Sequence, residues 1–246
     1  MARFRLVLEY DGGLFSGWQI QPTVQTVQGV LQVALARLFA QPITVIGAGR
    51  TDAGVHATAQ VAHFDSPFER PVGEIVRALN AMTPQGLSVL SAEEVEPSFH
   101  ARYSAFYREY SYKMSLRPEP PALERDRVWH HPRPLDIALM EEAGTYLLGT
   151  HDFSAFRAAS CSAPNPVRTV SVLRFTQEDE LLTLTIGANA FLYHMVRNMV
   201  GSLVKVGLGE WLPSYIKEVL EGRDRTKAGP MAPATGLYLT KISYPN

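Results

Sequence analysis

The chain has 246 residues, 46% hydrophobic and 19% charged, a composition that excludes a disordered protein and allows one large domain or two of ordinary size. Its formal net charge of −1 does not indicate nucleic-acid binding, although all but five of its 23 basic residues are arginine, which leaves an RNA partner open. The single Cys161 excludes an internal disulfide framework and a cysteine-rich zinc site. The lack of a long apolar run or a signal-peptide core leads us to expect a cytoplasmic protein without a membrane span.

The first hundred residues predict the element order βαββαβ. Alternating apolar residues over 3–10 are typical of a strand, and an apolar stripe over 26–40 is typical of a helix ended by Pro42. The elements predicted after these are a strand over 43–47, a glycine-rich loop, a strand over 59–64, a helix over 71–82 and a strand over 87–95.

A similar order is predicted for the rest of the chain, although the two halves show no sequence repeat. The predicted elements are a strand over 106–116, a proline-rich loop over 118–134, a helix over 135–148, strands over 168–177 and 181–188, helices over 191–206 and 213–220, and a strand over 236–244. This mixture predicts an α+β fold with two antiparallel sheets or one continuous sheet. We place the boundary near residue 104, which gives halves of 1–104 and 105–246.

The glycine-rich loop over 47–57, with the sequence GAGRTDAGVHA, is the first candidate site. Its three glycines let the backbone turn tightly or approach a ligand closely. Arg50 and Asp52 lie two residues apart, so a guanidinium could keep the carboxylate ionised and able to act as a nucleophile. The glycine spacing fits neither a dinucleotide-binding fingerprint nor a P-loop. The alternative is a structural turn in which Asp52 caps the next element.

The second candidate comprises the segment Phe99–Arg102 and the strand over 106–116. Arg108, Tyr110 and Tyr112 share one face of the strand, and alternating cations and rings are how a sheet can stack bases and hold phosphates. The alternative is an ordinary half-buried strand face, on which tyrosines are common.

The third candidate is the helix predicted over 191–206. His194, Arg197, Asn198 and Gly201 are spaced to share a face beside an apolar stripe. An arginine in so apolar a helix needs a partner such as a carboxylate in a cleft. The alternative is an arginine at the edge of the helix that faces solvent.

Metal chemistry is not predicted, because the seven histidines show no His-Glu-x-x-His or comparable spacing. No Gly-x-Ser-x-Gly elbow occurs either. We therefore expect no metal and no cofactor, and any chemistry should belong to carboxylate, tyrosine and arginine side chains.

Taken together, these segments resemble the TruA family of tRNA pseudouridine synthases along nearly the whole chain. The matching motifs, in order, are Tyr10-Asp11-Gly12, Phe15, Gly17-Trp18-Gln19, Thr26-Val27-Gln28, Gly49 to Ala57, Gln60 to Phe64, Phe99 to Arg102, His151-Asp152-Phe153, Phe191 to Gly201 and Gly236 to Leu239. One departure is visible at Tyr193, where the family pattern has histidine or another ring, and it leaves the catalytic assignment untouched.

The resemblance implies a role for each candidate. Asp52 would be the nucleophile, and Arg50 would help to hold the target nucleotide out of its helix. Tyr110 would stack on the target uracil, and Arg197 would pair with Asp52 and orient it. The remaining candidates for substrate binding are Arg108 and His194.

The resemblance also implies the architecture and the reaction. It implies two α+β halves around an extended antiparallel sheet, a basic cleft with the active site between them, and a homodimer. The implied reaction is isomerisation of uridine to pseudouridine at positions 38, 39 and 40 of the tRNA anticodon stem-loop, without a cofactor. Two alternatives stay open: a non-catalytic RNA-binding protein with the same fold, and a hydrolase of N-glycosidic bonds.

Overall fold

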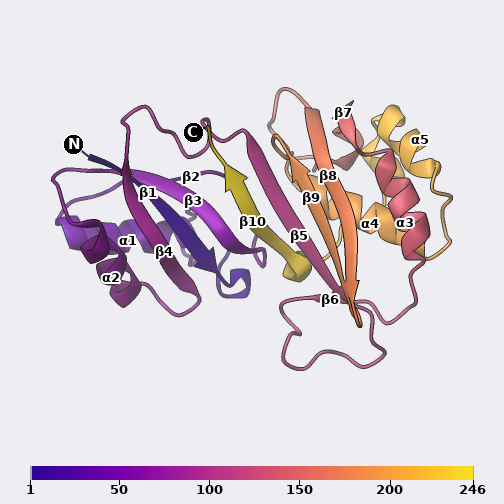
Figure 1. The fold of residues 1–246 in the computed structure, drawn as a ribbon, viewed down its shortest axis with the longest axis horizontal. Coiled ribbons are helices and arrows are strands. Elements are labelled where there is room, and N and C mark those ends of the chain that lie inside the picture. The colour runs from indigo at the N-terminus through magenta and orange to yellow at the C-terminus, as the bar shows by residue number, and fades with distance from the viewer. Residues whose placement is uncertain (1, 246) are drawn as a thin grey trace. The chain divides into compact units, whose positions relative to one another are not determined.

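The computed structural model describes residues 2–245, which form two compact units (Figure 1). Within the described residues, the first comprises 2–106 and 238–245, and the second comprises Tyr107–Leu237. The division falls near the expected residue 104. It differs from the expected halves because the last strand belongs with the first unit and not with the second.

The first unit has the order βαββαβ that the sequence predicts. Its elements are β1 (Ala2–Tyr10), α1 (Val27–Phe39), β2 (Ile46–Gly47), β3 (His56–Ser66), α2 (Val72–Met82) and β4 (Leu87–Val95), and β10 (Leu237–Ser243) returns to it from the C-terminus. The strand order is β4-β1-β3-β10, antiparallel except that β10 runs parallel to β3. The helices α1 and α2 lie together on one face of this sheet (Figure 1).

The alternation over β1 explains the core of the first unit. Phe4, Leu6, Leu8 and Tyr10 are all at most 3% exposed, as the strand periodicity predicts. The helix predicted over 26–40 is also confirmed: the Thr26 hydroxyl caps α1 by accepting from the Gly29 N–H.

The strand predicted over 43–47 is mostly wrong, because only Ile46–Gly47 pairs with β3. Side-chain amides of α1 take the place of the sheet. The Val45 N–H donates to the Gln32 carboxamide oxygen at 3.2 Å, and the Val45 carbonyl accepts from the Gln28 Nε2 at 2.9 Å. A sequence pattern cannot distinguish a backbone bonded in this way from one bonded to a strand.

The second unit contains more elements than the sequence predicts. They are β5 (Tyr107–Ser115), β6 (Trp129–His130), α3 (Ile137–Thr145), β7 (Gly149–Asp152), β8 (Val167–Glu178), β9 (Leu181–Ala188), α4 (Met195–Gly207) and α5 (Tyr215–Gly222), with short 3-10 turns at Ser154–Phe156, Arg225–Lys227 and Ala234–Gly236. The sheet order is β5-β9-β8-β7, all antiparallel, and β6 pairs in parallel with the end of β5. The helices α3, α4 and α5 pack on one another (Figure 1).

Three predictions for the second unit need correction. The loop predicted over 118–134 contains β6, and the helix predicted to Leu148 ends at Thr145 and is followed by β7. The helix predicted from residue 191 begins at Met195, because His194 has a φ of 63° that a right-handed helix does not accommodate. The overall α+β class is confirmed.

Among the described residues, no helix is both long and apolar enough to cross a membrane.

Candidate active site

The loop that carries Asp52 is bonded to the surrounding framework of the first unit. The Thr51 carbonyl accepts from the Trp18 N–H at 3.0 Å, and its side-chain hydroxyl lies 2.8 Å from the Tyr10 hydroxyl. The buried Gln60 side chain donates to the Gly49 carbonyl at 2.9 Å. Hydrogen bonds to Gly49 and Thr51 thus hold the loop on both sides of Arg50, although the loop has little regular structure of its own.

Asp52 begins a tight turn. The Val55 N–H donates to the Asp52 carbonyl at 3.1 Å, and Gly54 has a φ of 82°, the conformation for which a turn of this kind selects glycine. The Gly54 N–H in turn donates to the Gly12 carbonyl. Asp52 is half-buried, whereas Arg50 is exposed. The carboxylate therefore projects from a fixed backbone and remains accessible.

Two glycines in the N-terminal motifs let the chain approach this loop closely. A Cβ at Gly12 would lie 2.1 Å from the Val55 carbonyl oxygen. A Cβ at Gly17, whose φ is 85°, would lie 2.7 Å from the Thr51 carbonyl oxygen. Any side chain at either position would displace the loop. The motifs around residues 10–19 therefore shape the Asp52 loop.

His56, at the end of the loop, is also tied to this motif. Its Nδ1 lies 3.1 Å from the Gly12 amide nitrogen and 3.2 Å from an Asp11 carboxylate oxygen. In the neutral ring, Nδ1 accepts from Gly12 and the proton is on Nε2. In the protonated ring, Nδ1 donates to Asp11 instead. The ring also stacks on Tyr238 of β10 at 4.6 Å.

Tyr10 is a deeply buried polar ring beside the loop. Burial raises the pKa of Tyr10 to about 12, against the smaller opposing effect of its hydrogen bonds to Thr51 and Gln60. At neutral pH the hydroxyl therefore keeps its proton and links Thr51 to Gln60.

In the second unit, Arg108 and Tyr110 lie on β5, opposite Ala188 and Ile186 of β9. Tyr110 is half-buried, and its ring contacts Phe191 edge to face at 5.2 Å. The Arg108 side chain donates to the Asn189 carbonyl at 2.9 Å. Both side chains are thus fixed by the segment that follows β9.

Tyr112 shares this face but has a different role. It is fully buried, and its hydroxyl donates to the Pro233 carbonyl at 2.8 Å. Burial holds its pKa well above the usual range, with a smaller lowering by the charge of Arg197. At Tyr112 the alternative of an ordinary buried strand face therefore holds, and this ring is not available to stack on a base.

His194 lies just before α4 and not within it. Its left-handed backbone places its ring against Tyr193, with 3.9 Å between the ring centroids. Backbone strain at a residue other than glycine persists only where the surrounding structure enforces it, and it occurs often at functional sites. The expected helical face that His194 shares with Arg197 and Gly201 is therefore not formed.

Arg197, on the first turn of α4, is held by Ala232. Its Nε donates to the Ala232 carbonyl at 2.8 Å, and the Ala232 N–H donates back to the Arg197 carbonyl at 3.1 Å. This reciprocal pair fixes the stem of the side chain. The expected pairing of Arg197 with Asp52 stays a prediction.

The segment 228–233, which holds Arg197, was not identified from the sequence. A Cβ at Gly201 would lie 1.7 Å from the Pro230 carbonyl oxygen, so glycine at this position of α4 permits direct backbone contact. The Gly229 N–H donates to the buried Ser202 hydroxyl at 2.8 Å. The only signal for this packing in the sequence is the glycine within a helical pattern.

Within each unit, the structure groups the residues that the sequence singled out. Arg50 and Asp52 share the loop of the first unit. Around the segment 189–194 of the second unit lie the four others: Arg108, Tyr110, His194 and Arg197. A half-buried carboxylate on a bonded loop suits nucleophilic chemistry. An aromatic ring on the same strand face as a fixed guanidinium, as Tyr110 is with Arg108, suits a nucleotide.

The sequence matches the family model described as tRNA pseudouridine synthase over residues 6–104 and 143–245. The chain belongs to this family. The match includes Arg50, Asp52, His194 and Arg197. It omits residues 105–142, and with them Arg108 and Tyr110.

Curated relatives of the tRNA pseudouridine synthase family extend the similarity to the full chain. A protein named tRNA pseudouridine synthase A from Paramagnetospirillum magneticum is 49% identical over 99% of this chain and 96% of its own length. A protein of the same name from Xanthobacter autotrophicus is 48% identical over 99% of this chain and 100% of its own length. Another, from Thiobacillus denitrificans, is 47% identical over 100% of this chain and 94% of its own length. A solved structure, of a Cbf5-Nop10-Gar1 complex, aligns with 96% of this chain and 57% of its own at 12% identity, with a TM-score of 0.37.

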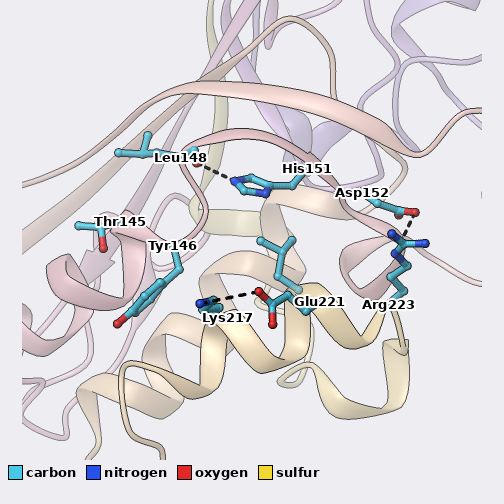
Figure 2. Close-up of a pocket in the computed structure, with 9 residues that line it drawn as sticks. Thr145, Tyr146, Leu148, His151, Asp152, Lys217, Glu221 and Arg223 are labelled. Atoms are coloured by element: carbon cyan, nitrogen blue, oxygen red, sulfur yellow. Dashed lines mark hydrogen bonds and ion pairs between the residues drawn. The ribbon is translucent and has the colours of Figure 1, made fainter.

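Two hollows in the described part of the second unit contain none of the residues that the sequence predicted for the tRNA pseudouridine synthase site. The first, of about 330 Å³, lies between β7 and α5 and is lined by residues that include His151, Asp152 and Lys217 (Figure 2). The second, of about 360 Å³, is lined by residues 154, 157–159 and 223–225. Within residues 2–245, no group of three or more histidine, cysteine, aspartate or glutamate residues could hold a metal ion.

Proposed function

We propose that this chain converts uridine to pseudouridine in tRNA, at positions 38, 39 and 40 of the anticodon stem-loop, with Asp52 as the nucleophile. The observation that carries the proposal is the half-buried Asp52 carboxylate, on a loop whose backbone is bonded to Trp18, Gly12 and Gln60, in a chain of the tRNA pseudouridine synthase family. A binding protein has little use for such a group, because a carboxylate repels the phosphates of RNA.

The reaction requires only groups of the kinds present here. The C1′–N1 glycosidic bond breaks, the uracil turns, and C5 of the base joins C1′. The C5 hydrogen leaves as a proton and N1 takes up a proton, so that the atoms balance. Asp52 acts on C1′ or C6 of the target, or assists by elimination. The reaction is an isomerisation, so it consumes no oxidant, reductant or energy source.

Tyr110 is the proposed platform for the target base. A uridine in a stem must leave the helix before it reacts, which costs a few kcal/mol. Stacking on an aromatic side chain returns about 1–3 kcal/mol of that cost. The edge-to-face contact with Phe191 fixes the Tyr110 ring before the base arrives.

The remaining candidates are proposed to bind the substrate or to orient Asp52. Arg50 is exposed, as a group must be to hold an extruded nucleotide. The bond between Arg197 and Ala232 fixes the guanidinium that is proposed to orient Asp52. Arg108 and His194 are proposed to bind the substrate around the segment 189–194.

The homodimer and the cytoplasmic location that the resemblance implies are also proposals. The location follows from the substrate, because tRNA is found where proteins are made. Sedimentation equilibrium tests the dimer: a single species with the mass of one chain at micromolar concentration would contradict it.

The decisive experiment is tritium release from a tRNA transcript labelled at C5 of uridine. The wild type should release tritium to the level of its modifiable sites. Asp52→Asn should release none above background while it still binds tRNA. Asp126→Asn serves as the control, because it removes a carboxylate that is 70% exposed elsewhere.

Each failure has its own meaning. Loss of tRNA binding in Asp52→Asn, with no release by the wild type, would favour a non-catalytic RNA-binding protein. Free uracil among the products would indicate hydrolysis of the N-glycosidic bond. Release from a transcript that lacks uridine at positions 38, 39 and 40 would refute the proposed sites.

A further inference from the structure

We infer that the hollow lined by Arg157, Arg223 and Arg225 binds a backbone phosphate of the RNA substrate. The hollow measures about 360 Å³, and Ser154, Ala158, Ala159 and Asp224 complete its lining. The inference rests on the proposed function for the identity of the ligand, and on the second unit alone for its geometry.

Three arginines reach this hollow from three different contexts. Arg157 directly follows the 3-10 turn Ser154–Phe156, and Arg223 ends α5 with a left-handed φ of 55°. Arg225 opens the next 3-10 turn, Arg225–Lys227. Arg223 and Arg225 belong to one segment and Arg157 to another, so the fold brings the charges of two segments together.

The carboxylates near the hollow are already engaged. Asp152 lies 3.4 Å from Arg223 and accepts from the Ser154 N–H; Figure 2 shows the Arg223 guanidinium directed at it. Asp224 caps the following turn by accepting from the Thr226 N–H and hydroxyl. Each carboxylate thus has a partner within its own segment. The Arg225 guanidinium is engaged as well, because it donates to the Ala228 and Gly229 carbonyls and to the Asn198 side chain.

Arg157 is the group best placed to bind an anion. It is only partly exposed, yet among the described residues its guanidinium has neither an ion pair nor a hydrogen bond. Burial raises the pKa of Asp152, but the Ser154 hydrogen bonds and the charges of Arg223 and Arg157 together lower that pKa below its ordinary value. Guanidinium groups bind phosphate in bidentate geometry, so a phosphodiester would satisfy Arg157.

The hollow is connected to the segment that carries the proposed substrate-binding residues. The Ala158 N–H donates to the Tyr193 carbonyl at 2.9 Å, beside His194. Arg225 donates to the Asn198 side chain at 2.9 Å, one residue after Arg197. A phosphate bound here would thus lie against residues that also hold the start of α4.

RNA is the source of phosphate that this arrangement favours. Arg223 is 67% exposed, so the hollow opens to a ligand that remains largely in solvent, as a polymer backbone does. Phosphate contacts position a nucleic acid without reading its sequence. The site would therefore act on every substrate tRNA alike.

The test is the salt dependence of tRNA recognition by Arg157→Gln. We expect its KM in the tritium-release assay to rise about tenfold with kcat within twofold, because one charge-assisted contact is lost in binding and none in the chemistry. The slope of log affinity against log salt should fall by about one. Arg157→Lys should keep the slope and recover part of the KM.

Arg125→Gln is the matched control, because it removes the same charge from a side chain that is 77% exposed elsewhere in the second unit. Its KM and salt slope should equal those of the wild type. An unchanged KM and slope for Arg157→Gln would overturn the inference, as would equal effects of the two variants.

Two further measurements separate the possible failures. Filter binding of unmodified tRNA reports on the hollow even if the wild type releases no tritium, so the inference can survive the failure of the proposed reaction. Titration with inorganic phosphate tests for a free anion. Binding that depends on Arg157, with no effect of Arg157→Gln on tRNA, would assign the hollow to a small anion and overturn the inference.

Discussion

At the scale of single residues, the Tyr10 hydroxyl joins β1 to the loop that carries Asp52. It lies 2.8 Å from the Thr51 hydroxyl and accepts from Gln60 at 3.3 Å, all in a buried setting. Tyr10→Phe should lower the free energy of unfolding by about 1–2 kcal/mol, because two buried polar groups lose a partner. It should also lower kcat more than it raises KM, because the loop backbone loosens.

Urea denaturation and steady-state kinetics measure the two effects of Tyr10→Phe. Tyr146→Phe is the control, because its hydroxyl has no hydrogen bond among the described residues. A Tyr10→Phe protein with wild-type kcat would mean that the other contacts of the loop are sufficient to position Asp52.

Tyr110→Phe separates stacking from hydroxyl chemistry. The phenyl ring keeps the stacking surface and the contact with Phe191, so tRNA binding should stay within twofold of the wild type. Turnover should be lost, because we expect the hydroxyl to take part in the reaction. Single-turnover kinetics at saturating enzyme give the comparison, and a near-wild-type rate would exclude a role for the hydroxyl.

At the scale of elements, α4 packs directly on the segment 228–233, and this contact fixes Arg197. Gly201→Ala would place a Cβ 1.7 Å from the Pro230 carbonyl oxygen. The segment must then move away, which should cost about 1–3 kcal/mol of stability. Because Ala232 holds the Arg197 Nε, kcat should fall together with stability.

Gly222→Ala, on helix α5, should stabilise the protein and so contrasts with Gly201→Ala. No atom lies within 4 Å of the Cβ that it would add, and alanine favours a helix over glycine by about 0.5–1 kcal/mol. Thermal melting should therefore show a lower melting temperature than the wild type for Gly201→Ala and a higher one for Gly222→Ala. A Gly201→Ala protein as stable as the wild type would show that the segment yields without cost.

The elements that the sequence predicts well are those whose own side chains determine them. β1 and α1 bury their periodic apolar residues, and Thr26 caps α1 as a helix start requires. Residues 43–45 were mispredicted because glutamine side chains of α1 bond their backbone. β6 and β7 are two and four residues long, too short for a period to be visible.

At the scale of the whole molecule, the sequence predicts the class of fold and offers candidate residues, but it does not predict how those residues are held. The segment Phe99–Arg102, for example, is part of the second candidate site that the sequence predicts. In the structure, the Ala101 N–H donates to the His63 Nδ1 at 3.1 Å, which anchors this motif to β3. Contacts between residues 38 positions apart leave no local pattern, so the role of such a motif becomes visible only in the fold.

This buried histidine predicts how stability depends on pH. Burial lowers the pKa of His63 to about 4 from an ordinary value of 6.5, with help from the charges of Arg3 and His100 and against the effect of Asp65. Burial also lowers the pKa of His100 and of His131. Between pH 6.5 and 4 the unfolded chain therefore binds protons that the folded chain does not.

The stabilisation due to a neutral His63 is fully present above pH 6.5 and is lost as the pH falls toward 4. The urea midpoint should therefore decrease over this window, and His63→Asn should flatten the decrease. Because the substitution also changes the bond to Ala101, the slopes are compared and not the midpoints themselves, with both proteins measured at pH 7.5 as the reference. Equal slopes for the two proteins would mean that His63 binds its proton as readily in the folded chain as in the unfolded one. His100, His131 and the acidic groups would then account for the whole acid dependence.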